Sequence, residues 1–147
     1  MLTKPMLATL WPRAKPGVID GILSVSNDVL KAAQITTPER LAHFMAQISH
    51  ECRGGEIVRE NMNFKPRRLV EVFGKKSAYV TPQQAVALEG RPQAIAERVY
   101  GLGNPVKAKD LVNTQHGDGG RYRGNGMLQL TGRASHREIG QKIGVDL

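Results

Sequence analysis

Three glutamates, Glu51, Glu56 and Glu60, lie within ten consecutive residues of the sequence. Two carboxyl groups can hydrolyse a glycosidic bond when one donates a proton to the leaving oxygen and the other activates water. In inverting enzymes the two groups lie roughly 6.5–9.5 Å apart. Glu51 and Glu60 can face each other across such a gap if the glycines between them turn the chain. On spacing alone, the simpler interpretation is favoured, in which the three glutamates solvate the end of a helix.

A second set of polar residues lies near the end of the chain. The stretch MLQLT predicts a short strand with Gln129 and Thr131 on one face, and Ser135 follows one turn into a predicted helix. An amide and two hydroxyls suit sugar hydroxyls, N-acetyl groups and a nucleophilic water. They also suit an exposed strand face and an ordinary helix N-terminus. The preceding YRGNG loop can direct backbone N–H groups toward a substrate or simply form a turn.

Other kinds of chemistry find less support in the sequence. His50-Glu51 is not a zinc-protease motif, because Gly54 stands where the second histidine is required. The four histidines are scattered without ligand spacing, and the GDGG stretch lacks the alternating oxygen ligands of a calcium loop. The single cysteine, Cys52, excludes an intramolecular disulfide and is predicted to be a small core residue. We therefore expect no metal site and no cofactor.

The candidate acid Glu51 requires a helix that delivers it to a fixed place. Thr37 suits the N-cap of such a helix, and Pro38 suits its first position. An apolar stripe at helical spacing follows, formed by Leu41, Phe44, Met45, Ile48 and Cys52. Glu51 lies on or beside this stripe, so we expect it to be partly withdrawn from water, which favours the protonated form that a general acid needs. This predicts a bell-shaped pH profile with an acid limb near neutral.

The other elements are also predicted to be helical. Residues 1–16 are predicted to form a loosely structured lead-in. From residue 101 to residue 126 the composition changes to glycine, asparagine, lysine and aspartate, and GDGGRYRGNG within it is predicted to be a loop. Further helices are predicted at residues 17–33, 66–73, 82–89, 92–100 and 134–143. The pattern predicts a mostly α-helical fold with at most a small β-hairpin or short strands.

The chain has 147 residues, of which 21 are basic and 13 acidic, for a formal net charge of +8. This length suits one domain with a substantial core. The charge favours a polyanionic partner such as an acidic cell-wall polymer, anionic lipid or nucleic acid. No aromatic residues are interleaved with the basic clusters at Lys65, Arg67 and Arg68 and at Lys75 and Lys76, so we expect a solvated basic face and no nucleic-acid partner.

Three blocks of the sequence, taken together, resemble glycoside hydrolase family 19. They are FMAQISHECRGGEIVRENMNF, AIAERVYG and GDGGRYRGNGMLQLTGRASHREIG, and they cover most of residues 40–147 in order. This chitinase-like, lysozyme-related group includes many bacteriophage endolysins. The resemblance implies a two-lobed, lysozyme-like helical fold over residues 1–147. Relatives continue through further helices, so we expect the C-terminal part of the usual domain to be missing.

The resemblance also implies roles for individual residues. Glu51 matches the general acid of the family, and Glu60, rather than the nearer Glu56, matches the general base that activates water. Gln129 and Thr131 match residues that bind substrate and help to hold the water. Further substrate contacts are expected at Tyr122, Asn125 and Ser135.

The chain departs from the family pattern at three places. Asn125 stands where the family usually has Arg or Lys, and Ser135-His136 stand where it usually has Asn-Tyr. Phe64-Lys65 stand where Tyr-Ser is common. The change at Ser135 affects one expected sugar contact, because serine is shorter than asparagine and carries a single hydroxyl.

The function expected from this resemblance is that of an endolysin, which hydrolyses β-1,4 glycosidic bonds of peptidoglycan with inversion and so lyses bacterial cells. Prolines and charges interrupt the apolar N-terminus before a signal peptide could form, and no stretch is long enough to span a bilayer. We therefore expect synthesis in the host cytoplasm and action at the cell wall after holin-type release. The expected partners are glycan strands and the anionic cell envelope, with a monomeric chain and no specific protein partner. The alternatives are a chitinase and a truncated, inactive glycan-binding remnant.

Overall fold

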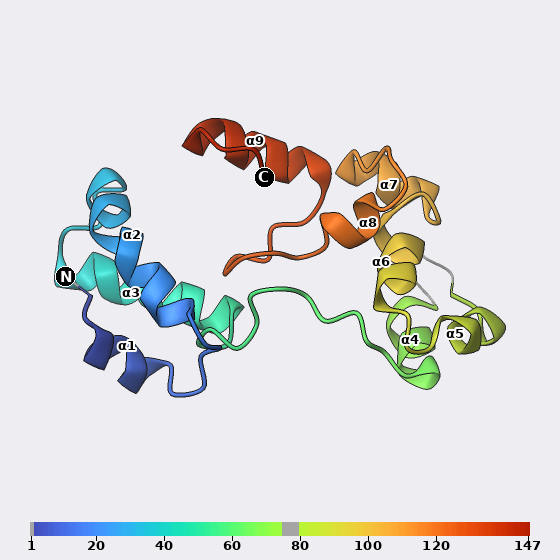
Figure 1. The fold of residues 1–147 in the computed structure, drawn as a ribbon, viewed down its shortest axis with the longest axis horizontal. Helices are drawn as coiled ribbons and strands as arrows, with labels where there is room; N and C mark the ends of the chain where they lie inside the picture. The colour runs from blue at the N-terminus through green and yellow to red at the C-terminus, as the bar shows by residue number, and fades with distance from the viewer. Residues whose placement is uncertain (1, 75–79) are drawn as a thin grey trace. The chain divides into compact units, whose positions relative to one another are not determined.

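The computed structural model describes residues 2–74 and 80–147, so Lys75 and Lys76 of the predicted basic face lie outside the described residues. This part of the chain is mostly helical, as predicted, and contains no β-strand beyond isolated bridges. Its contacts divide it into two compact units (Figure 1). Unit 1 comprises Met1–Val58 and Gly126–Gln129, and unit 2 comprises Arg59–Asn125 and Leu130–Leu147.

Nine helices form the described part of the chain. In order they are α1 (Lys4–Leu10), α2 (Val18–Ala32), α3 (Pro38–Glu51), α4 (Pro66–Phe73), α5 (Pro82–Leu88), α6 (Pro92–Tyr100), α7 (Pro105–Leu111), α8 (Asp118–Arg121) and α9 (Arg133–Ile143). No helix of the described residues is both long enough and apolar enough to cross a membrane.

Helix α3 of unit 1 begins as its sequence predicts. Pro38 occupies the first turn, and the Thr37 hydroxyl accepts a hydrogen bond from the Arg40 backbone N–H at 3.3 Å. The predicted stripe faces the core of unit 1, in which Met45, Ile48 and Cys52 are buried. Cys52 is therefore a core residue, as predicted.

The lead-in to unit 1 is more ordered than the sequence predicts, because residues 4–10 form α1. Leu7 and Trp11 are buried in the same core as α3, and the Trp11 indole N–H donates to the Ser49 hydroxyl at 2.6 Å. Met6 and Leu10 remain exposed on α1. The sequence does not predict this helix, because its seven residues span only about two turns, which is too short for a helical period to be recognised.

The turn after α3 requires its two glycines. Gly54 and Gly55 have φ angles of +61° and +80°, a region that residues with a Cβ rarely adopt. A Cβ on Gly54 would lie 3.1 Å from the Trp11 ring, and one on Gly55 would lie 3.1 Å from Ala14. This close approach lets the chain reverse directly over the buried indole, immediately after Glu51.

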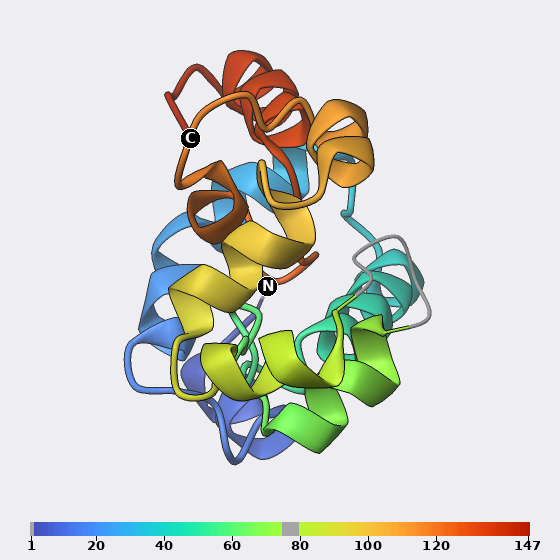
Figure 2. The ribbon, with the colours of Figure 1, turned by 90° about the vertical axis from the view of Figure 1, so that its right-hand side faces the viewer.

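Unit 2 has its own core, built from helices α4, α5 and α6. α4 packs against α5, and α6 packs against α8 (Figure 2). The buried side chains of this core are Met62, Leu69, Phe73, Val80, Ala85, Ile95, Ala96 and Val99. All three helices begin with the predicted proline in the first turn. Only α5 also has a capping side chain, because Thr81 and Gln84 form a reciprocal capping box at its start.

Two helices of unit 2 were not predicted: α7 lies in the stretch of changed composition, and α8 lies in the predicted GDGGRYRGNG loop. The start of α7 carries the same signal as α3 and α5, because Asn104 caps it through its side chain and Pro105 occupies its first turn. α8 is a single turn that contains two glycines, Gly119 and Gly120, and no sequence pattern distinguishes such a turn from a loop.

The prediction of a strand at MLQLT is wrong. Asn125 and Leu130 exchange two backbone hydrogen bonds, of 3.0 and 2.8 Å, which close a tight loop around the residues between them. Gly126 and Gln129 both adopt positive φ, which is incompatible with an extended strand. The alternation of polar and apolar residues therefore does not reflect two faces of a strand.

A partly buried ion pair, in which the carboxylate is buried and the guanidinium is partly exposed, joins α8 to α9 in unit 2. Arg133 donates to both carboxylate oxygens of Asp118, from Nε to Oδ2 at 2.9 Å and from Nη2 to Oδ1. Burial on its own would raise the pKa of Asp118, but hydrogen bonds from Arg133 and from the Gln115 backbone N–H outweigh it and lower the pKa. The ionised carboxylate is therefore part of the folded state.

We expect Asp118→Asn to lower the free energy of unfolding by about 2 kcal/mol at neutral pH, because the substitution removes the charge that strengthens the two hydrogen bonds from Arg133. The pKa of Asp118 is lower in the folded chain than in the unfolded chain, so the contribution is present above about pH 4 and is lost as the pH falls further. Urea unfolding at neutral and acidic pH measures this free energy. The difference in the free energy of unfolding between the variant and the wild type should be smaller at acidic pH. The control Glu138→Gln removes an exposed pair with Lys142 and should change little. An equal effect of both substitutions would contradict this account.

Candidate active site

Glu51, the candidate acid, is the last residue of α3 in unit 1 and is exposed. The expectation that it is partly withdrawn from water is wrong, and the predicted acid limb near neutral loses its basis. Ile48 and Cys52 lie on the buried face of the helix. Glu51 lies about 100° around the helix axis from Cys52, so its side chain is not covered by the core. Its Oε1 accepts a hydrogen bond from Gln47 Nε2, one turn earlier, at 2.9 Å.

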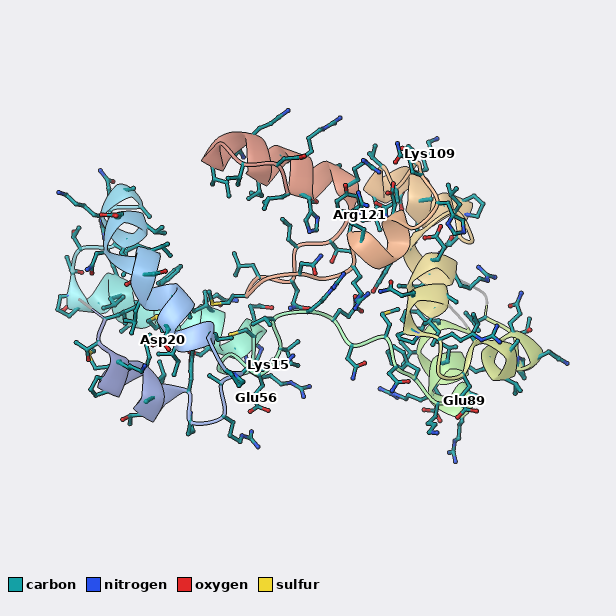
Figure 3. The ribbon with its side chains drawn as sticks, in the orientation of Figure 1. Lys15, Asp20, Glu56, Glu89, Lys109 and Arg121 are labelled. Atoms are coloured by element: carbon teal, nitrogen blue, oxygen red, sulfur yellow. The ribbon has the colours of Figure 1, made fainter. Side chains whose placement is uncertain are left out.

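Glu56 has a different partner from the other two glutamates. Its Oε1 lies 2.8 Å from Arg13 Nη2, in an ion pair at the surface of unit 1 (Figure 3 labels Glu56). This pair occupies Glu56 in a contact with the α1–α2 connection. Glu51 has no such ionic partner among the described residues.

Glu60, the candidate base, belongs to unit 2 and is held at its side chain and its backbone. Its Oε1 accepts a hydrogen bond from the Tyr100 hydroxyl at 2.9 Å, and its Oε2 accepts one from the Gly124 N–H at 3.3 Å. The Glu60 N–H donates to the Gly124 carbonyl at 2.7 Å, and the Glu60 carbonyl accepts from Arg123 Nε at 3.0 Å. The carboxylate is therefore fixed in orientation and surrounded by donors.

Tyr100, the last residue of α6, is a site residue that the sequence did not single out. Burial, followed by the charge of Glu60 and the hydrogen bond to Glu60, raises the pKa of the Tyr100 hydroxyl well above its usual range. The phenol therefore stays protonated and donates to Glu60 over the physiological pH range. Tyr100 belongs to AIAERVYG, one of the three blocks that resemble the family. Nothing in that block indicates that its hydroxyl contacts Glu60, 40 residues earlier in the sequence.

Tyr122, the first residue of the loop after α8, packs against residues of α9. Its side chain is buried, and the centroid of its ring lies 5.1 Å from that of the His136 ring and 4.9 Å from the Arg133 guanidinium. The Tyr122 carbonyl accepts from the Gly132 N–H at 2.8 Å. These contacts join the loop to the start of α9.

Asn125 and His136, two of the departures from the family pattern, contact each other. Asn125 Nδ2 donates to the Arg121 carbonyl at 3.1 Å and lies 3.3 Å from His136 Nε2. His136 Nδ1 lies 2.8 Å from the Gly132 carbonyl. Since the Gly132 oxygen can only accept, His136 carries its proton on Nδ1, and Nε2 accepts from Asn125. The two side chains thus form one partly buried hydrogen-bonded pair.

The structure does not place the predicted substrate-binding residues on one face. Gln129 belongs to unit 1, where its Nε2 donates to the Gly126 carbonyl at 2.9 Å and the Ile57 carbonyl at 3.4 Å. Thr131 and Ser135 belong to unit 2 and are half-buried. Glu51 and Glu60 are likewise divided between the two units. The substrate-binding and catalytic roles of these residues stay predictions.

Among the described residues, no group of three or more His, Cys, Asp or Glu side chains is placed to hold a metal ion.

The whole of this chain matches part of a longer protein of known sequence. The glycosyl hydrolase family 19 domain-containing protein of Haemophilus influenzae (strain ATCC 51907 / DSM 11121 / KW20 / Rd) is 30% identical to it over 149 residues. The match covers 100% of this chain and 68% of the relative. The chain belongs to glycosyl hydrolase family 19. No protein-family model matches it. Membership of family 19 implies glycoside hydrolase activity.

The hydrogen bond between Tyr100 and Glu60 can be tested without an activity assay in a double-mutant cycle. Tyr100→Phe, Glu60→Gln and the double variant should show a coupling of about 1.5 kcal/mol in the free energy of unfolding, because hydrogen bonds to a charged group are among the stronger ones. Urea denaturation measures all four proteins.

The matched control for this cycle pairs Tyr100→Phe with Glu89→Gln, which removes a carboxylate of unit 2 that pairs with Lys65. This pair should show no coupling, because the two side chains share no contact. Coupling near zero between Tyr100 and Glu60, or equal coupling in both cycles, would contradict the described geometry.

Proposed function

We propose that this family 19 chain is an endolysin that hydrolyses β-1,4 glycosidic bonds of peptidoglycan by an inverting mechanism. Glu51 protonates the leaving oxygen, and Glu60 activates the attacking water from the opposite side of the sugar. Gln129, Thr131, Ser135, Tyr122 and Asn125 contribute to substrate binding or to the support of the substrate loop.

The observation that carries the proposal is the fixed carboxylate of Glu60. A general base must hold an acceptor oxygen in a set direction while it takes a proton from water. Tyr100 and Gly124 each donate to a different oxygen of Glu60, and a carboxylate oxygen with two lone pairs can still accept from water. Glu51, in contrast, is exposed at a helix end, where it is accessible to a leaving group.

The distribution of charge supports peptidoglycan over chitin as substrate. Unit 2 contains 15 basic and 8 acidic residues, whereas unit 1 contains 6 and 5. Exposed side chains such as Lys109 and Arg121, labelled in Figure 3, contribute to this excess. Chitin carries no charge, whereas the bacterial cell envelope is anionic and attracts a basic unit, more strongly at low salt.

The biological role that fits this proposal is lysis of a bacterial host by a phage-type enzyme. The enzyme is made in the host cytoplasm and reaches the wall after holin-type release. It acts as a monomer on glycan strands, with no nucleic-acid or specific protein partner.

The proposal predicts that Glu51→Gln and Glu60→Gln each reduce activity at least about 100-fold, because each removes one member of the acid–base pair. Clearing of outer-membrane-permeabilised bacteria, followed by turbidity, measures this activity. Glu56→Gln is the matched control: it removes a neighbouring carboxylate whose partner is Arg13 and should retain activity within about twofold.

Three outcomes would contradict the proposal. Equal clearing by wild type and Glu51→Gln would reject the assigned acid. Cleavage of chitin oligomers without cleavage of peptidoglycan would favour a chitinase. Absence of any cleavage by the wild-type chain, with retained binding to glycan, would favour a glycan-binding protein.

A further inference from the structure

Two arginines of unit 2, Arg59 and Arg123, converge on one backbone oxygen. Arg59 Nη2 donates to the Gly120 carbonyl at 3.3 Å, and Arg123 Nη1 donates to the same oxygen at 3.1 Å. Two like charges are thus held close together, although a single neutral carbonyl cannot compensate both. Such an arrangement favours the binding of an anion, because protein groups compensate the two charges only in part.

The two guanidinium groups have no carboxylate partner of their own. Neither forms an ion pair in the described part of the chain, where eight other lysines and arginines do. Burial, followed by the charge of Arg59, lowers the pKa of Arg123, and the opposing effect of Glu60 is smaller than either. The neighbourhood of Arg123 is therefore more positive than Glu60 can offset.

The arginine pair is tied to the candidate base. Arg123 Nε donates to the Glu60 carbonyl at 3.0 Å, and Arg59 is the residue directly before Glu60. Gln93 and Gly120, which both accept from Arg123 Nη1, also line a pocket of about 500 Å³, a volume typical of ligand sites. Arg123 is thus hydrogen-bonded both to the Glu60 backbone and to two residues that line the pocket.

We propose that Arg59 and Arg123 form an anion-binding subsite that takes a carboxylate of the peptide stem of peptidoglycan. A guanidinium can donate two parallel hydrogen bonds to the two oxygens of a carboxylate. Because Arg59 is exposed, it can direct two N–H groups toward a bound carboxylate. The glycan backbone of chitin offers no such group. This subsite rests on the proposed function, and it makes the stem, in addition to the sugars, a determinant of specificity.

The test compares binding of two defined ligands, a peptidoglycan disaccharide that carries its tetrapeptide and the same disaccharide without peptide. Binding is measured by calorimetry in a Glu51→Gln background, so that the ligand is not cleaved. We expect the parent protein to bind the peptide-bearing ligand about tenfold more tightly, as charge-assisted hydrogen bonds allow. Arg59→Gln should lose most of this preference. Arg59→Lys should lose part of it, because lysine keeps the positive charge but lacks the paired N–H donors of a guanidinium.

Arg137→Gln is the matched control, because it removes the same charge from an exposed position on α9 of the same unit and should keep the preference. The proposal is overturned if the parent protein shows no preference, if Arg59→Gln keeps it, or if Arg137→Gln loses it equally, which would indicate general charge attraction. Inorganic phosphate that competes as well as acetate would indicate an unselective anion site and would overturn the assignment to a carboxylate. Absence of hydrolysis together with an intact preference would reject the catalytic proposal and leave the subsite standing.

Discussion

The register between Glu60 and Gly124 is the constraint on which the candidate site depends. The Glu60 N–H donates to the Gly124 carbonyl, and the Gly124 N–H returns a hydrogen bond to the Glu60 side chain. Because the second bond goes to the carboxylate, the same contact that aligns the two backbones also orients the carboxylate. A shift of one residue would take Glu60 away from Tyr100 and Arg123 together.

Most helices could be predicted because their start signals are local. A capping side chain followed by proline fixes the first turn without reference to the rest of the chain, as at Thr37-Pro38 and Thr81-Pro82. The same signal at Asn104-Pro105 begins α7, so this helix also has a local start signal in the sequence. The predicted strand failed because alternation cannot reveal positive φ at a residue such as Gln129.

The candidate site could be predicted only as a set of residue types. The family resemblance named Glu51 and Glu60, but their surroundings depend on contacts between distant parts of the chain. Tyr100 is 40 residues from Glu60, and Arg123 is 63 residues away. The exposure of Glu51 differs from the prediction because, at the last residue of a helix, a position beside the apolar stripe need not be covered. Asn125 and His136, eleven residues apart in the sequence, likewise contact each other only in the fold.

The central claim is that two carboxylates act as acid and base on opposite sides of the bond, without a covalent intermediate. The most direct test is the configuration of the first product, read by proton nuclear magnetic resonance at the newly formed reducing end during early hydrolysis of peptidoglycan glycan. Inversion of a β-linked substrate predicts that the α-anomer appears first and then equilibrates. Initial appearance of the β-anomer would contradict the account, because it would require a nucleophilic carboxylate and a covalent glycosyl-enzyme intermediate in place of a water activated by Glu60.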